Sequence, residues 1–143
     1  MSAHPLTARH MARGAAFLGS KHAILCGAMS WVSERNLVSA ISNAGGFGVI
    51  ACGAMTPDLL DREIAGTKAL TGKPFGVNLI TMHPALFDLI AVCAKHQVSH
   101  VVLAGGIPPK GSVEAIKASG AKVICFAPTL ALAKKLLRSG ADA

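Results

Sequence analysis

Short apolar runs alternate with longer segments of helical spacing five times along this chain. The apolar runs are almost uninterrupted, which is typical of strands that helices cover on both faces of a parallel sheet. The runs occupy residues 22–29, 46–51, 74–80, 100–105 and 121–127. The pattern therefore predicts an α/β protein of about five strand–helix units.

The segments between these runs contain the start and stop signals of helices. Thr56 and Pro57 supply an N-cap and a first-turn proline, and Gly72, Gly120 and Gly140 stand where helices would end. The predicted helices span residues 32–44, 57–71, 84–96, 112–119 and 129–139. Each apolar run is thus followed by a helix, as parallel pairing requires.

Two parallel architectures fit this order, an open doubly wound sheet and a (β/α)8 TIM barrel. The stretch CGAMSWVSE (26–34) has neither the glycine spacing of a dinucleotide fold nor a P-loop, which favours the barrel. A barrel needs about 250 residues and eight units, whereas these 143 residues end at SGADA, where a sixth strand would begin. We expect a partial barrel over residues 18–143, truncated before strand six, after an N-terminal extension of residues 1–17.

The composition and net charge argue against several classes of function. The formal net charge is +7, but Trp31 stands alone and tyrosine is absent, so no stacking platform for nucleic acid accompanies the charge. We expect instead that the positive charge attracts an anionic ligand or cofactor. No apolar span reaches the roughly 18–20 residues that cross a membrane. The four cysteines lack C-x-x-C spacing, which predicts buried thiols in a reducing, cytoplasmic compartment and no metal site.

Three blocks of the sequence resemble the nitronate monooxygenase family, formerly called 2-nitropropane dioxygenases, which includes flavin-dependent enoyl-acyl-carrier-protein reductases. The blocks are ILCGAMSWVSERNLVSAISNAGGFGVIACGAMTPDLL, TGKPFGVNLI and ASGAKVICFAPTLALAKKLLRSGADA. They run in register from about Leu18 to the last residue and correspond to the N-terminal part of family members. The resemblance implies an FMN-binding (β/α)8 barrel with its substrate pocket at the carboxyl ends of the strands.

The first candidate cofactor contacts are Gly27, Ala28 and Met29, which follow the first predicted strand. Small residues there let the backbone approach a flat ring, and the resemblance implies that this loop lies against the flavin. The alternative is a tight turn in which Met29 fills the core. The family often has Gln-Gly-Gly-Met here, whereas this chain has Cys at position 26 and Ala at position 28, so no contact that needs the Gln side chain is expected.

Asn78 is the polar residue of PFGVNLI, and an amide at a barrel strand end needs a partner. The resemblance implies that it binds FMN, because its donor and acceptor suit the edge of an isoalloxazine ring. The alternative is a structural amide. Gly105 and Gly106 are weaker candidates for close approach, with a plain loop as the alternative.

None of the six histidines is a clear candidate for a catalytic base. His83 alone follows a predicted strand on the reactive side, where it is either a substrate contact or, with Pro84 behind it, a helix-start residue. The resemblance implies that the catalytic His lies beyond residue 143, as do the loops that hold the FMN phosphate. The catalytic residue is therefore unknown from this sequence.

The resemblance implies an FMN-dependent nitronate monooxygenase, which oxidises alkyl nitronates with O2 to a carbonyl compound and nitrite. We expect the chain as given to bind FMN weakly and to be weakly active or inactive. The alternatives are an FMN-dependent enoyl-acyl-carrier-protein reductase and an inactive fragment that binds flavin or a partner. An open sheet exposes its edges, so we expect a homo-oligomer or pairing with a missing C-terminal portion.

Overall fold

The last four of the five apolar runs form a parallel sheet. The computed structural model describes residues 4–143. Its strands pair in the order β1-β2-β3-β4, and they are β1 (Val49–Ala51), β2 (Gly76–Ile80), β3 (His100–Ala104) and β4 (Lys122–Cys125). The helices are α1 (Pro5–Leu18), α2 (Arg35–Asn43), α3 (Pro57–Leu70), α4 (Leu86–Lys95), α5 (Ser112–Ala118) and α6 (Leu130–Arg138). The predicted α/β class and parallel order are confirmed.

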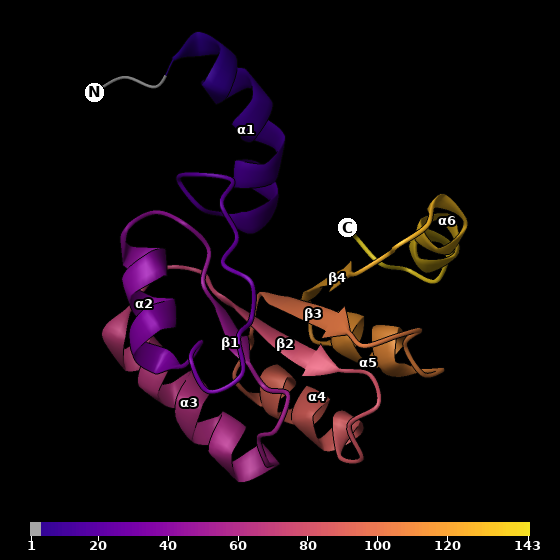
Figure 1. The fold of residues 1–143 in the computed structure, drawn as a ribbon. Helices are drawn as coiled ribbons and strands as arrows, with labels where there is room; N and C mark the ends of the chain where they lie inside the picture. Colours follow the sequence, from indigo (N-terminus) through magenta and orange to yellow (C-terminus); the bar gives the residue numbers. More distant parts are fainter. Residues whose placement is uncertain (1–3) are drawn as a thin grey trace.

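The two faces of the sheet have different neighbours (Figure 1). On one face, alternate strand residues such as Val77, Leu79 and Leu103 belong to a large core with residues of α3, α4 and α5. On the other face, Val49 and Val102 belong to a smaller apolar cluster. Since successive strand residues point to opposite faces, this second face corresponds to the interior of a barrel.

The first predicted strand, residues 22–29, is largely wrong. It makes a single parallel bridge, between Leu25 and Phe47, in which Phe47 N donates to Ile24 O (2.9 Å) and Cys26 N donates to Phe47 O (3.0 Å). No further ladder bond joins these two described segments: Gly48 O faces β2, where it accepts from Gly76 N (2.9 Å), and Ala51 N donates to Ser33 O (3.0 Å). The place of Ser33 beside β1 depends on the turn before α2, which local sequence does not show.

The N-terminal extension contains helix α1, which the sequence pattern does not predict. Its last turn closes the amino end of the second face: Phe17 O accepts hydrogen bonds from His100 Nε2 (2.9 Å) and Lys122 Nζ (2.7 Å). Burial lowers the pKa of His100, and the hydrogen bond to Phe17 O opposes part of this shift. His100 thus lies at the end of the sheet opposite the strand-following loops. Within residues 4–143, neither α1 nor another helix is long and apolar enough to span a bilayer.

Residues 141–143 lie beside β4. Asp142 N donates to Val123 O (2.8 Å), and Cys125 N donates to Ala143 O (2.9 Å). The Asp142 carboxylate also accepts from Val123 N (2.8 Å) and from Lys117 Nζ (2.7 Å). This is the place at which the repeat predicts the sixth strand.

Candidate functional site

The candidate site is the second face of the sheet, near the carboxyl ends of the strands. Ala51, Asn78, Val102 and Ile124 stand side by side in the strand register. Val102 and Ile124 pack in the cluster on this face, while Val77 and Leu79, on either side of Asn78, pack in the helix-covered core. The Asn78 side chain therefore faces away from the helices, on the face that a barrel encloses.

Asn78 is a largely buried residue whose amide is unpartnered in the described residues but not sealed from solvent, because only Thr81 has a fully buried, unpartnered side-chain oxygen or nitrogen there. The residue is only 7% exposed, and in residues 4–143 no side-chain hydrogen bond involves its amide; its main-chain oxygen accepts from Cys52 N (3.0 Å). A fully buried unpaired amide lowers stability by about 1–3 kcal/mol, and the cost at Asn78 is smaller because its amide keeps some contact with solvent. A ligand with both an acceptor and a donor at its edge would satisfy it. Both interpretations of Asn78, a cofactor contact and a structural amide, stay predictions.

The Gly27–Met29 loop stands beside the same face. Ala28 packs against the apolar cluster of Phe47, Val49 and Val102. A side chain at Gly27 would meet nothing within 4 Å, so packing inside the chain does not require this glycine. Met29 is 46% exposed. It does not fill the core, contrary to the alternative interpretation of this turn.

The buried Ser33 hydroxyl holds this loop in shape. It accepts from Met29 N (3.0 Å) and donates to Gly27 O (3.4 Å). The main-chain oxygen of Ser33 accepts from Ala51 N (3.0 Å), which fixes the loop to the end of β1. The three candidate residues are therefore presented by a loop tied to the sheet.

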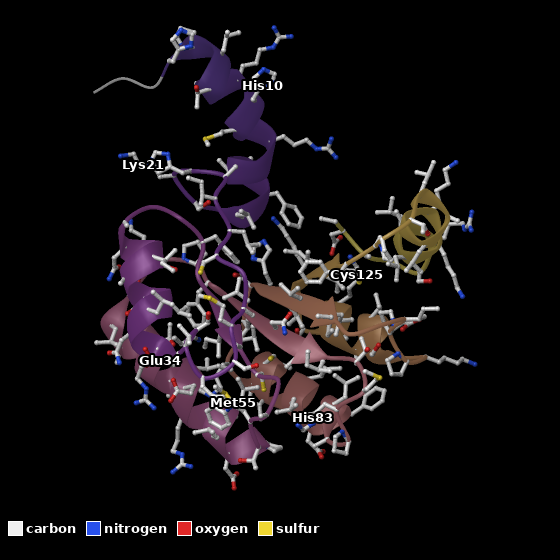
Figure 2. All side chains as sticks on the ribbon, viewed as in Figure 1. His10, Lys21, Glu34, Met55, His83 and Cys125 are labelled. Carbon is white, nitrogen blue, oxygen red and sulfur yellow. The ribbon has the colours of Figure 1, made fainter. Side chains whose placement is uncertain are left out.

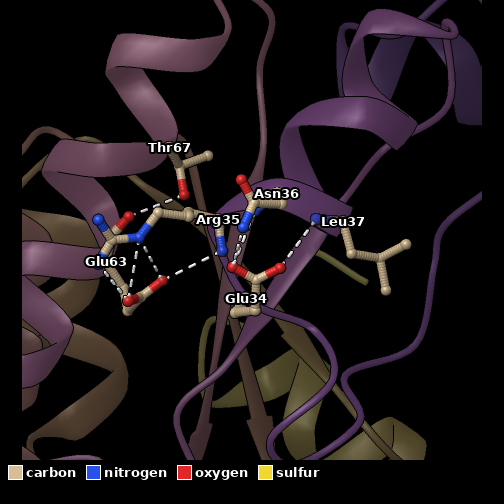
Figure 3. A network of polar contacts seen from close by, with 6 residues as sticks. All are labelled: Glu34, Arg35, Asn36, Leu37, Glu63 and Thr67. Carbon is tan, nitrogen blue, oxygen red and sulfur yellow. Dashed lines mark hydrogen bonds and ion pairs between the residues drawn. The ribbon is translucent and has the colours of Figure 1, made fainter.

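Immediately after Ser33, a polar network fixes the start of α2 (Figure 3). Glu34 caps the helix by accepting from Asn36 N (3.0 Å) and Leu37 N (3.2 Å). Arg35 N donates to Glu63 Oε2 of α3 (3.1 Å), and Arg35 Nη2 lies 2.5 Å from Glu63 Oε1. Sequence reasoning missed this pair, because no local pattern relates positions 35 and 63. It joins the site loop to the scaffold.

Replacing Glu63 with Gln is expected to lower the melting temperature by a few degrees at pH 7. Hydrogen bonds and charge from Arg35 hold the pKa of Glu63 below its ordinary value. The stabilisation is therefore present above about pH 4.3, the unfolded pKa, and is lost as the pH falls through the folded pKa. Thermal melts of wild type and E63Q at pH 7 and pH 3 measure this, with the exposed Asp88→Asn as control. A gap of equal size at both pH values would contradict it.

The loops after β2 and β3 contribute further groups at the carboxyl edge. His83, labelled in Figure 2, accepts from Ala85 N through Nδ1 (3.1 Å), as a helix-start residue does. Gly105 and Gly106 both have positive φ, +91° and +141°, which only glycine adopts readily. Thr81 lies beneath them, and its hydroxyl is the only fully buried side-chain oxygen or nitrogen of residues 4–143 without a hydrogen-bond partner. Sequence reasoning did not single out Thr81.

The two buried cysteines, Cys52 and Cys93, do not add a nucleophile. Burial raises the pKa of the Cys52 and Cys93 thiols to about 12, so both stay protonated at neutral pH. In the described part of the chain, no three His, Cys, Asp or Glu residues are grouped to hold a metal ion. The arrangement offers hydrogen-bonding and apolar contacts to a flat ligand, and no acid–base pair.

A comparison with protein families matches residues 12–127 to the family described as nitronate monooxygenase. Among curated proteins, an octahydroindene-carboxyl-CoA dehydrogenase of Mycobacterium tuberculosis is 36% identical over 127 residues, covering 88% of this chain and 35% of that protein. A nitronate monooxygenase of Pseudomonas aeruginosa is 27% identical over 164 aligned positions, covering 88% of this chain and 47% of that protein. The chain thus spans about a third to a half of these relatives.

Solved structures agree with the sequence relatives. FabK from Thermotoga maritima is 38% identical, with a TM-score of 0.83 over 91% of this chain and 42% of that chain. A nitroalkane oxidase from Streptomyces ansochromogenes is 25% identical, with a TM-score of 0.75 over 83% of this chain and 44% of that chain. These matches confirm the predicted fold, a partial (β/α)8 barrel.

Proposed function

This chain belongs to the nitronate monooxygenase family, and on that premise we propose that it forms the N-terminal part of an FMN-dependent nitronate monooxygenase. Such an oxidoreductase converts alkyl nitronates and O2 into a carbonyl compound and nitrite. The observation that supports this most is the buried, unpartnered Asn78 amide on the barrel-interior face. When bound, FMN supplies a ring that accepts electrons from the nitronate and passes them to O2.

The residues present fit a flavin at this place. Asn78 would donate and accept at the polar edge of the ring, which satisfies its amide. Gly27 leaves space for the ring to approach the backbone, and Ala28 and Met29 would contact it through apolar atoms. The basic balance of the chain, +7 at pH 7, would favour an anionic cofactor.

We assign no base within residues 4–143. The Nδ1 atom of His83 is engaged by Ala85 N, and His100 lies at the amino end of the sheet against Phe17. We therefore propose that these 143 residues bind FMN weakly and turn over nitronates slowly or not at all.

The proposal is tested on the purified chain with two separate measurements. Quenching of FMN fluorescence on titration gives the affinity, and release of nitrite from ethyl nitronate in air gives turnover. We expect saturable but weak FMN binding and turnover near the uncatalysed rate. No saturable FMN binding would overturn the flavin site, and stoichiometric FMN with fast nitrite release would overturn the assignment of the chain as weakly active.

A second candidate is an FMN-dependent enoyl-acyl-carrier-protein reductase, which would receive hydride from a nicotinamide cofactor. Two likenesses favour it: FabK at 38% identity and a dehydrogenase whose name specifies a CoA thioester at 36% identity. The basic surface also suits an acidic carrier protein. Oxidation of NAD(P)H with a crotonyl thioester, compared with nitrite release from a nitronate, separates the two reactions.

The assembly state is part of the proposal. A partial barrel leaves strand edges for another chain to pair with, so we propose a homo-oligomer or pairing with a C-terminal portion. Sedimentation that shows a stable monomer would contradict this.

A further inference from the structure

Trp31 has an unusual backbone conformation for its residue type. Its φ is +62°, in the left-handed region that few residues other than glycine, asparagine and aspartate adopt. It lies in a tight turn, in which Val32 N donates to Met29 O (3.0 Å). A turn with positive φ at this position normally has Gly or Asn there. A bulky aromatic residue is therefore placed where the local geometry disfavours it.

The other non-glycine residue with positive φ in the described chain has a structural explanation that Trp31 lacks. Gln97, with φ +51°, ends α4 in a common helix-terminating turn, because Val98 N donates to Cys93 O (3.0 Å). Trp31 ends no helix. Its side chain is 74% exposed, so packing inside the chain does not hold it there either.

The position of Trp31 points to a ligand. It follows Met29 by two residues, and with Ser30, Ala51, Ala54 and Met55 it lines a water-sized cavity of about 10 Å³ at the end of β1. Further exposed apolar side chains occupy the loops at the same edge of the sheet, and these are Met29, Val32, Met82, Ile107 and Phe126. The loop that presents Trp31 is fixed to the sheet through Ser33.

We propose that Trp31 determines substrate specificity by packing its indole against the apolar chain of a substrate bound over the Gly27–Met29 loop. This rests on the proposed function, since the substrate class is an alkyl nitronate. The favourable contact between a ligand and the exposed indole ring would offset the backbone strain at Trp31. The enzyme would therefore prefer long alkyl chains, by about fourfold for each methylene that becomes fully buried.

The test measures binding without turnover. Wild type, Trp31→Phe, Trp31→Asn and the control Leu70→Asn are titrated by anaerobic calorimetry, with saturating FMN, against the nitronates of nitroethane and 1-nitrohexane. Asn tolerates positive φ, so W31N should fold with an unchanged or higher melting temperature. L70N removes an equally apolar, half-exposed side chain from the end of α3.

We expect wild type and L70N to bind the hexyl nitronate at least about tenfold tighter than the ethyl nitronate. W31F should keep most of this preference, and W31N should reduce it to less than about threefold while leaving ethyl binding within about twofold. Because Trp31 is the only tryptophan, its fluorescence in wild type should shift on hexyl binding.

Three results would overturn the inference: no chain-length preference in wild type, an undiminished preference in W31N, or no binding of either nitronate. A preference that depends on Trp31, together with no saturable binding of FMN, would support the inference and overturn the proposed flavin site. The two proposals can therefore fail separately.

Discussion

Replacing Gly48 with Ala is expected to destabilise the fold by about 3 kcal/mol or more, and the variant is expected to accumulate poorly in soluble form. A Cβ at position 48 would lie 2.4 Å from Val38 O and 2.9 Å from Val38 Cα. Both are backbone atoms of α2, so no side-chain rotation relieves the overlap. The helix would have to move away from the sheet, breaking the contacts of its buried face.

Urea denaturation followed by circular dichroism measures this effect. Gly72→Ala is the matched control, because a Cβ there meets nothing within 4 Å. It should be neutral or slightly stabilising, since alanine restricts the unfolded chain more than glycine does. Equal stability of G48A and G72A would show that α2 does not pack as closely on the sheet as the structure has it.

The structural roles of the glycines in ISNAGGFGVI (41–50) are only partly predictable from the sequence. Gly45 takes the positive φ, +93°, that the turn after α2 needs, and the absence of a side chain at Gly48 lets it approach the backbone of α2. The sequence does not show that the run at 22–29 makes only one bridge, to Phe47. That outcome depends on how the turn before α2 places Ser33 O, which accepts from Ala51 N, beside β1.

The helices and strands predicted most accurately are those marked in the local sequence by an apolar run or a capping residue. The apolar runs at 74–80 and 100–105 became β2 and β3, and the cap at Thr56 starts α3 as expected, with its hydroxyl accepting from Leu59 N (3.3 Å). The sequence pattern does not predict helix α1, because the position of this helix depends partly on contacts with residues far away in the sequence. Phe17 is held by His100 and Lys122, residues more than 80 positions away.

The residues of the candidate site also differ in how far the sequence alone predicts them. Strand alternation is enough to place Asn78 on the barrel-interior face, because its neighbours are apolar and the period is two. The isolated hydroxyl of Thr81 and the Arg35–Glu63 pair follow from tertiary contacts, which the sequence does not show. The positive φ of Trp31 is not predictable from its residue type, because turns with this conformation normally have Gly or Asn there.

Replacing Asn78 with Leu is expected to weaken FMN binding by about 10- to 100-fold while leaving the fold as stable as before or more stable. Leucine has a similar size, and it removes an amide that has no protein partner on this buried face. A ligand edge that had bonded to the amide would then be buried unpaired. FMN titration and urea denaturation of the same preparations measure the two effects separately.

The control is Asn36→Leu on α2, whose amide donates to Glu34 (2.9 Å) away from the sheet. It should leave FMN affinity unchanged and lower stability slightly. The two interpretations of Asn78 predict opposite signs. A structural amide requires N78L to lose stability and keep its flavin affinity, whereas a cofactor contact requires it to keep stability and lose flavin. Destabilisation with undiminished FMN binding would therefore remove Asn78 from the proposed site.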